Sequence, residues 1–225
     1  MKLFLEIELL SDASFGRGDG LSNVVDAEIE HDPSTGCPFI KGRSIKGLLV
    51  EECANLLFSI EKISKKEGEK YSRVAAKLFG VPGSSAEGDG TISFSDACLP
   101  ALLRVEIADA IAQNHITAQQ VLESLTDVRS LTSINYETGA PQNNSLRSIR
   151  VLLHSVPLTS TIYTAGDLED TEKSLLSACV MSLRRGGSGR NRGRGKLNCR
   201  LMENDDKELT TQYFDPLKMI LSTGG

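Results

Sequence analysis

Residues 184–200 combine the two residue types that most often hold phosphate groups. The stretch reads RRGGSGRNRGRGKLNCR and contains seven basic residues, five glycines and no acid. Arginine offers a permanently charged, bidentate donor, and glycine lets backbone N–H groups approach a phosphate closely. The chain has 25 Lys and Arg against 30 Asp and Glu, so without this stretch the balance is 18 against 30. A segment so opposed to the rest of an acidic chain favours a polyanion ligand over a merely solvated, flexible loop.

The order of residues in this stretch excludes two nucleotide-binding fingerprints. A dinucleotide motif that starts at Gly187 and Gly189 needs glycine where the chain has Arg192. A P-loop needs Ser or Thr after Lys196, where the chain has Leu197. We therefore expect the phosphates of a polymer to be the ligand. The expected contact residues are Arg184, Arg185, Gly186, Gly187, Gly189, Arg190, Arg192, Gly193, Arg194 and Lys196.

A second group of basic residues lies where the clearest helix begins. Apolar residues recur at helical spacing from Ile45 to Ile60, and Ser44 is the expected N-cap. The N-terminus of a helix presents free N–H groups and a partial positive charge to an anion. The second expected phosphate site therefore consists of Lys41, Arg43, Ser44 and Lys46.

The hydrophobic patterns predict an α+β fold. Apolar residues alternate from Leu3 to Leu9, as in a strand with one buried face. A second amphipathic helix, from about Leu168 to Arg185, begins with acids and ends with arginines, which suits the helix dipole, and Gly186 ends it. Further strands are expected at residues 91–98, 149–163 and 196–202. This order indicates a ferredoxin-like or RNA-recognition-motif sheet with two helices and long insertions.

The length of 225 residues suits one substantial core, so residues 1–225 are expected to form a single domain. Residues 108–125 are expected to be helical in part. Residues 62–70 are rich in lysine and glutamate and are expected to be a solvated surface segment. Four segments are expected to interrupt the sheet-and-helix pattern: a loop at 11–42, an insertion at about 61–90, a thumb-like, Ser- and Asn-rich insertion at about 127–148 and the Gly-rich loop at 186–195.

Cysteine usage and hydropathy restrict the cellular setting. The five cysteines are odd in number and widely spaced, and no C-x-x-C motif occurs, which argues against a disulfide framework or a zinc site. No apolar run approaches the ~20 residues that span a membrane. Glu6 and Glu8 interrupt the apolar N-terminus, unlike a signal peptide. We expect a cytoplasmic protein with no membrane partner.

The stretch from Asp32 to Gly47 resembles a known family. It reads DPSTGCPFIKGRSIKG and matches, almost without a break, a pattern of the RAMP superfamily, the RNA-binding subunits of prokaryotic CRISPR effector complexes. Three further segments resemble that superfamily in the expected order: Phe79-Gly80 with residues 92–97, residues 134–139 and the Gly/Arg-rich loop. Within the superfamily, the chain is most similar to the repeating backbone subunits of type III complexes, CRISPR-associated family seven.

The resemblance implies a function. Such subunits polymerise with other CRISPR-associated subunits along a CRISPR RNA, and a thumb on each displaces one base of the guide–target duplex. An aspartate ahead of the Asp32 turn cleaves the complementary target RNA, and the matching position here is Asp26. Asp26 is thus the candidate catalytic residue and the candidate ligand of a divalent ion, expected to be Mg²⁺. Because one carboxylate holds Mg²⁺ weakly, RNA phosphates must complete the site, and activity is expected only in the assembled complex.

Two other functions stay open. A RAMP subunit that binds or caps the guide RNA without catalysis has the same motifs. A guide-processing endoribonuclease of the superfamily would use histidine and no metal. His31 is a candidate general base, and Asp12, Asp19 and Asp32 lie near Asp26 in sequence. Of these, Asp32 precedes a proline and is expected to form a turn.

Overall fold

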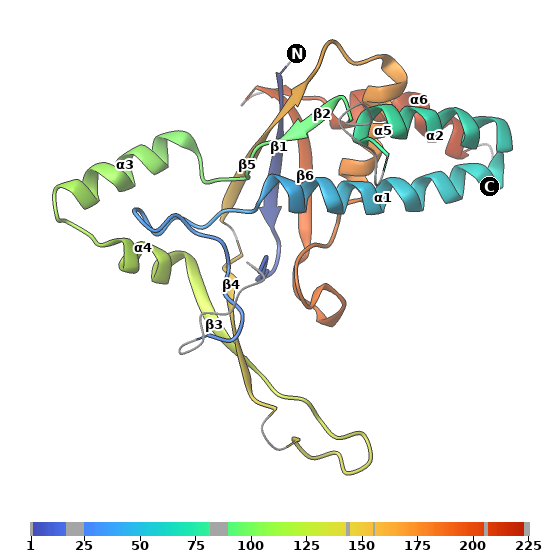
Figure 1. Ribbon diagram of the computed structural model, residues 1–225. Helices are drawn as coiled ribbons and strands as arrows, with labels where there is room; N and C mark the ends of the chain where they lie inside the picture. Colours follow the sequence, from blue (N-terminus) through green and yellow to red (C-terminus); the bar gives the residue numbers. More distant parts are fainter. Residues whose placement is uncertain are drawn as a thin grey trace.

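The computed structural model describes residues 2–16, 25–81, 90–142, 145–154, 156–204 and 207–222. Within them, one antiparallel sheet has the order β2-β5-β1-β6-β7 (Figure 1). Its strands are β1 (Lys2–Leu9), β2 (Ile92–Phe94), β5 (Pro157–Thr164), β6 (Leu197–Asn204) and β7 (Lys207–Glu208). The central strand, β1, pairs with β5 from Lys2 to Glu8 and with β6 from Phe4 to Leu9. The residues expected to face the core, Leu3, Leu5, Ile7 and Leu9, are all buried, which confirms the predicted alternation.

Helices cover one face of this sheet: α1 (Gly42–Ile63), α2 (Lys65–Phe79), α5 (Asp170–Ser182) and α6 (Thr210–Ser222) (Figure 1). The apolar stripe of α1 is buried at Ile45, Leu49, Cys53 and Ile60, as its spacing predicts. It packs against α5, whose residues from Leu175 to Val180 are buried throughout. The core therefore lies between the sheet and this helical layer. No helix among the described residues is long and apolar enough to cross a membrane.

The first turn of α1 differs from the prediction. The helix begins at Gly42, and Lys41 occupies the N-cap position without a capping side chain, so Ser44 is not the N-cap. Instead, the Gly42 N–H donates to the carboxylate of Asp96 at 2.8 Å. A Cβ at position 42 would lie 2.1 Å from the carbonyl oxygen of Phe94, so glycine lets α1 approach β2 this closely. The acceptor of this N–H, Asp96, lies 54 positions away in the sequence, so no local pattern could predict it.

Two stretches are more helical than expected. The charged stretch at 62–70, expected to be a solvated segment, continues α1 to Ile63 and then forms α2, which buries Tyr71, Leu78 and Phe79. The remainder of the insertion expected at about 61–90 lies mostly outside the described residues. The helix α6 was not foreseen, because Pro216 interrupts its sequence pattern. The second expected helix, α5, begins at Asp170 and not at Leu168.

Two parts project from the sheet-and-helix body (Figure 1). A helical lobe consists of α3 (Ala101–Ala112) and α4 (Ala118–Leu125), which cover the stretch expected to be partly helical. A hairpin consists of β3 (Thr126–Leu131) and β4 (Arg147–Leu152), paired from Thr126–Leu152 to Leu131–Arg147. The single strand expected over 149–163 is therefore two strands, β4 and β5, in different sheets, and Pro157 begins the second.

Candidate nucleic-acid interface

The Gly/Arg-rich loop, residues 186–195, joins α5 to β6 and is fixed by its backbone. The Gly186 N–H donates to the Gly195 carbonyl at 2.9 Å, which closes the loop at its base. The Ser188 N–H donates to the Ser14 carbonyl at 2.7 Å. Positive φ angles occur at four of the glycines: Gly187, Gly189, Gly193 and Gly195. A Cβ on Gly195 would lie 1.9 Å from the Gly186 oxygen, so this path requires glycine.

Two hollows adjoin along this loop. One of about 330 Å³ lies between the loop and the first turns of α1, and Ser44, Gly47 and Glu51 line its helical side. The other, of about 630 Å³, lies between the loop and the hairpin, where Leu131 and Ile149 line it. Both hollows are lined by Gly187, Ser188 and Arg190. Together they form a groove from α1 to the hairpin, here named the loop groove.

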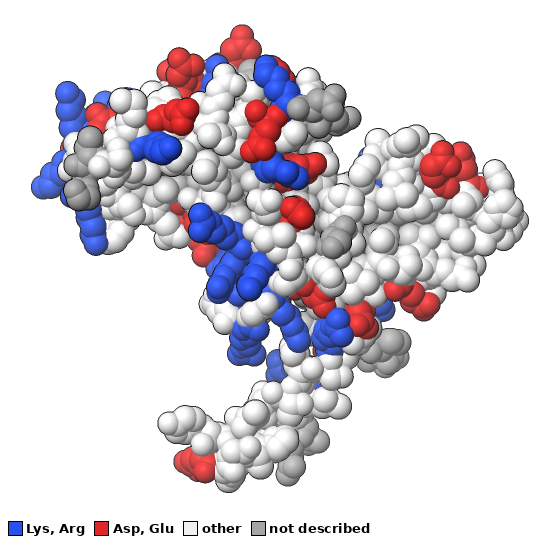
Figure 2. Space-filling view, turned by 180° about the vertical axis from the view of Figure 1, so that it is seen from behind, with Lys and Arg blue, Asp and Glu red and all other residues white. Residues whose placement is uncertain are grey.

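The basic residues near the loop groove differ in whether an acid already holds them. The guanidinium of Arg190 binds both carboxylate oxygens of Glu51, at 2.7 and 3.0 Å, and so ties the loop to α1. Lys41 forms an ion pair with Glu30. Among the described residues, no acidic partner is found for Arg43, Lys46, Arg184, Arg185, Arg192, Arg194 and Lys196. Figure 2 shows Lys and Arg side chains gathered on the rear face above the hairpin.

The basic residues of 184–196 are continuous in sequence, but in the structure they line two separate hollows. Arg192 and Arg194 line the loop groove. Arg184, Arg185 and Lys196 line a separate hollow of about 580 Å³ beside β6. The expected residues of the first turns of α1 are also divided, because Ser44 lines the loop groove whereas Lys41 is turned to Glu30. The cations best placed for a ligand in the loop groove are therefore Arg192 and Arg194.

Asp26 lies at the base of the hairpin, at its surface. Residues 25–29 run beside β4, where the Ala27 N–H donates to the Ser148 carbonyl at 3.2 Å and the Ala27 carbonyl accepts from the Arg150 N–H at 2.9 Å. The Ser148 N–H and hydroxyl donate to Oδ2 of Asp26, at 2.6 and 3.2 Å. These bonds, first the backbone N–H and then the hydroxyl, hold the pKa of Asp26 below its ordinary value of 3.8. The carboxylate is therefore exposed, fixed and ionised at neutral pH.

A buried ion pair anchors the Asp26 segment. The Glu28 carboxylate accepts from Nε of Arg150 at 2.8 Å, and Arg150 also donates to the Thr126 hydroxyl at 3.2 Å. All three side chains are buried, as are Val25 and Ile29. Sequence reasoning missed Ser148, Glu28 and Arg150. Because the Asp26–Ser148 and Glu28–Arg150 pairs span 122 positions, no local pattern could have found them.

The other acidic candidates have structural roles. Burial disfavours ionisation of Asp12, but hydrogen bonds from Arg129 and His154 outweigh it and leave the Asp12 pKa below its ordinary value. A guanidinium nitrogen of Arg129 lies 2.7 Å from Oδ2 of Asp12, so this ion pair links Asp12 to strand β3 of the hairpin.

Asp32 forms the predicted turn. Its Oδ1 accepts from the N–H and the hydroxyl of Ser34 at 2.7 and 2.6 Å. The ring Nδ1 of His31 lies 3.3 Å from the Ile29 carbonyl. Asp19 lies outside the described residues. Among the aspartates described here, Asp26 is therefore the exposed one whose carboxylate is fixed by a residue of the hairpin, Ser148.

A divalent ion fits Asp26 only as part of a shared site. Among the described residues, no group of three or more His, Cys, Asp or Glu side chains is placed to hold a metal ion. Mg²⁺ usually keeps several waters and takes one or two carboxylates together with substrate phosphates. One exposed, ionised carboxylate suits a site of that kind, which RNA phosphates complete.

Comparison with known proteins places the chain in a family. A model of the RAMP superfamily matches residues 6–198, which confirms the resemblance drawn from residues 32–47. The fold is similar to a chain of Type III-B Cmr-beta bound to cognate target RNA (13% identity, TM-score 0.61, 89% of this chain and 97% of that one). It is equally similar to a chain of the apo state (13% identity, TM-score 0.62, 91% and 98%). No curated protein sequence matches the chain. Because the family model covers most of its length, the chain belongs to the RAMP superfamily.

Proposed function

We propose that the protein is a backbone subunit of a type III CRISPR RNA-guided complex. In this role it binds CRISPR RNA along the loop groove and cleaves complementary target RNA at Asp26 with a divalent ion. Membership of the RAMP superfamily and the fold similarity to Cmr-beta chains, one of them in a complex with target RNA, support the setting. The observation that carries the chemistry is the exposed, ionised Asp26 carboxylate, which Ser148 of strand β4 holds in place on the projecting hairpin.

The finer description of the fold follows from the strand order. The order β2-β5-β1-β6, with α1 and α5 on one face, supports a ferredoxin-like core in a single domain. The hairpin and the α3–α4 lobe are then insertions into this core. We assign the hairpin the role of the thumb, which displaces a base of the guide–target duplex.

Guide binding rests on two kinds of group. Arg192 and Arg194 line the loop groove without an acidic partner among the described residues, so their charges are available to phosphates. The glycines keep side chains away from the loop backbone, so RNA can approach its N–H groups. Arg43 and Lys46 in the first turns of α1, and Arg184, Arg185 and Lys196 beside β6, add further positive charge. With about five contacts to single-stranded RNA, log K falls against log[salt] with a slope of about −3 to −4.

The residues around Asp26 prepare the carboxylate for cleavage. Ser148 fixes its orientation and keeps it ionised, and the Arg150–Glu28 pair fixes the backbone that carries it. Arg147 places a further positive charge near the same point. A divalent ion bound at Asp26 supplies positive charge at the scissile phosphate. Target RNA completes the site, so the proposed activity appears only in the assembled complex.

Cleavage by the reconstituted complex tests this proposal. With Mg²⁺ present, Asp26→Ala is expected to abolish one defined cut in the target RNA, by at least about 100-fold, and to leave target binding unchanged. A matched control is Asp127→Asn, which removes an exposed charge from the nearby strand β3. An identical cutting pattern with Asp26→Ala would contradict the catalytic role.

A second candidate function, guide binding without catalysis, is favoured by the single carboxylate at the site. In that case the complex makes no metal-dependent cut that depends on Asp26. Substitution of Arg192 and Arg194 still weakens guide binding, so the two functions are separated by the same set of variants.

A further inference from the structure

The outer edge of β6, on the side away from β1, is covered at two points and open between them. At one point, the Leu197 N–H donates to the Arg184 carbonyl at 2.9 Å. At the other, the Leu201 carbonyl accepts from the Leu209 N–H at 2.8 Å, and the Leu201 N–H donates to the Thr210 hydroxyl at 2.8 Å. The stretch of edge from Leu197 to Leu201 is named here the edge gap.

The pairing with β1 shows which backbone groups face the edge gap. The Lys196 carbonyl accepts from the Leu10 N–H at 2.8 Å, so Lys196 directs its backbone groups to β1. Successive residues of a strand direct these groups to opposite edges, so those of Cys199 face the gap. Among the described residues, no partner is found for the Leu197 carbonyl or for the N–H and carbonyl of Cys199. Because Cys199 is only 6% exposed and buried backbone groups are normally paired, these three groups point to a missing ligand.

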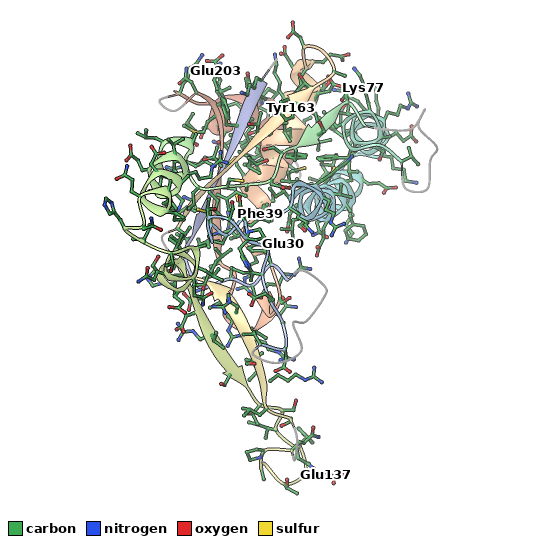
Figure 3. The ribbon with its side chains drawn as sticks, turned by 60° about the vertical axis from the view of Figure 1, so that its left-hand side comes forward. Glu30, Phe39, Lys77, Glu137, Tyr163 and Glu203 are labelled. Carbon is green, nitrogen blue, oxygen red and sulfur yellow. The ribbon has the colours of Figure 1, made fainter. Side chains whose placement is uncertain are left out.

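The hollow of about 580 Å³ beside β6 opens over the edge gap. Its lining includes Leu10 and, at the end of α5, Met181 and Leu183. None of the described residues that line it is aromatic, so it offers no ring on which a nucleobase could stack. Figure 3 shows Glu203, near the end of β6, far from Glu137 at the hairpin tip, so the hollow belongs to the body of the molecule. Its aliphatic lining suits an aliphatic side chain.

The charges around the hollow differ between the two ends of the edge gap. Three exposed cations without an acidic partner among the described residues lie at the Leu197 end: Arg184, Arg185 and Lys196. A fourth cation in the lining, Arg200, is held by Glu6 at 2.9 Å. Of the described lining residues, the one carboxylate is that of Glu208, beside Leu209 at the opposite end of the gap. An anion is therefore attracted to the Leu197 end.

We propose that the edge gap binds the C-terminal segment of a partner protein as a short added strand. Antiparallel to β6, three residues satisfy all the free groups: the first exchanges two hydrogen bonds with Cys199, and the third donates its N–H to the Leu197 carbonyl. The terminal carboxylate then lies at the cations of the Leu197 end. The first residue directs its side chain to the same face as that of Cys199, toward the aliphatic lining.

The edge gap favours a chain terminus over an internal segment, because the protein's own backbone closes the gap at Arg184 and at Leu209. An internal strand would have to leave the edge at both ends within about 13 Å, whereas a terminus leaves it once. The free groups also favour a peptide over RNA. Two of the three are carbonyls, which need donors, and phosphate oxygens only accept. The inference goes beyond the proposed function and does not depend on RNA binding or cleavage.

Fluorescence anisotropy with labelled peptides and the full chain, without RNA, tests the proposal. The probes end in Ser-Leu-Ser-Glu, Ser-Ile-Ser-Glu or Ser-Val-Ser-Glu with a free carboxylate, so that the aliphatic residue lies opposite Cys199. We expect saturable binding. The same peptides with an amidated end are expected to bind about tenfold more weakly, because they lack the charge that the cations hold.

N-methylated peptides test the strand pairing without any change to the protein. A methyl group on the nitrogen of the aliphatic residue or of the final Glu removes an N–H that bonds to Cys199 or Leu197. Each is expected to weaken binding by about tenfold or more. The matched control carries the methyl group on the Ser between them, whose N–H points away from β6. Its affinity is expected to stay close to that of the unmodified peptide.

Variants of the protein locate the contacts. Changing Arg184 and Arg185 together to Gln is expected to reduce the affinity for the free-carboxylate peptide to that for the amide, whereas Arg192→Gln, at the loop groove, is the control. Met181→Glu is expected to weaken binding because it places a charge in the aliphatic lining. Met219→Glu on α6, where the side chain is 72% exposed and outside the hollow, is its control.

Four results would overturn the inference. They are no saturable binding of any of the three peptides, equal affinities for the free and amidated ends, equal effects of the three N-methyl positions, and displacement by RNA. For the last, a short single-stranded RNA would displace the peptide as well from a chain with Arg192 and Arg194 changed to Gln as from wild type. The hollow would then be an RNA site.

Discussion

Two segments flank the base of the hairpin, and they are fixed by opposite means. Residues 25–29 are held by side chains in addition to the two backbone bonds of Ala27, because the buried Glu28–Arg150 pair and the Ser148 bonds fix the backbone around Asp26. The Gly/Arg-rich loop is held by its backbone, which folds back on itself where a side chain at Gly195 would collide with the Gly186 carbonyl. The position of the Asp26 carboxylate thus depends on a buried ion pair. The path of the Gly/Arg-rich loop depends on glycines that leave room for its own backbone. Different substitutions should therefore disable the two.

The largest expected effect is on the Asp26 segment. Arg150→Met leaves the buried Glu28 carboxylate without its cation, which is expected to lower the free energy of unfolding by about 3 kcal/mol or more. Urea denaturation measures this change. The control is Arg129→Met, whose pairs with Asp12 and Asp127 are partly exposed and contribute about 1 kcal/mol or less. Equal losses in the two variants would contradict the anchoring role of the Glu28–Arg150 pair.

A pair of glycine substitutions tests the loop without changing its charge. Gly195→Ala places a Cβ 1.9 Å from a carbonyl oxygen, whereas a Cβ at Gly193, where φ is +85°, meets no atom within 4 Å. Gly193→Ala is expected to cost only the left-handed backbone strain, about 1 kcal/mol. Gly195→Ala is expected to cost more than twice as much and to weaken RNA binding, as thermal unfolding and filter binding would show. Equal RNA affinities in the two variants would indicate that the shape of the loop does not matter for binding.

Charges within the loop are expected to contribute unequally. Changing both Arg192 and Arg194 to Gln removes two cations that line the loop groove, so the slope of log K against log[salt] for single-stranded RNA is expected to flatten by about 1.4. Arg190→Gln is the matched control, because Glu51 already holds that guanidinium, and its effect on the slope is expected to be smaller. A larger effect of Arg190→Gln would show that the pair opens when RNA binds.

The sequence predicted the parts of the fold that local periodicity encodes. The alternation in β1, the buried face of α1 and the excursion that became the hairpin are all visible as repeating or composition patterns. The expected start of α1 was wrong by three residues because the side chain that binds its first N–H, Asp96, belongs to a segment 54 positions away. The same limit explains α6, whose position is decided by packing against α5 despite Pro216.

In the candidate site, too, the decisive partners are distant in sequence and no local pattern reveals them. Composition marked Arg190, Arg192 and Arg194 as equivalent, but Glu51, 139 positions from Arg190, distinguishes one of them from the other two. The motif resemblance led to Asp26, yet the serine that fixes its carboxylate is 122 positions away. Residue types can therefore be predicted from a sequence, whereas the pairing that decides which charges are available depends on the topology that brings distant strands together.

The smallest expected effect concerns the charge of Asp26 itself. Its hydrogen bonds from Ser148 favour the ionised form, so the pKa in the folded protein lies below 3.8. The resulting stabilisation is present above the unfolded-state pKa and is lost as the pH falls through the lower, folded-state value. Ser148→Ala removes the hydroxyl bond but keeps the backbone N–H bond at 2.6 Å, so the pKa is expected to rise only part of the way to its ordinary value. An NMR titration of the Asp26 carboxyl carbon in both proteins measures the difference. A wild-type midpoint at or above 3.8 would mean that Ser148 does not hold the carboxylate in its charged form, and the contrast between a segment fixed by side chains and a loop fixed by backbone would then rest on the Glu28–Arg150 pair alone.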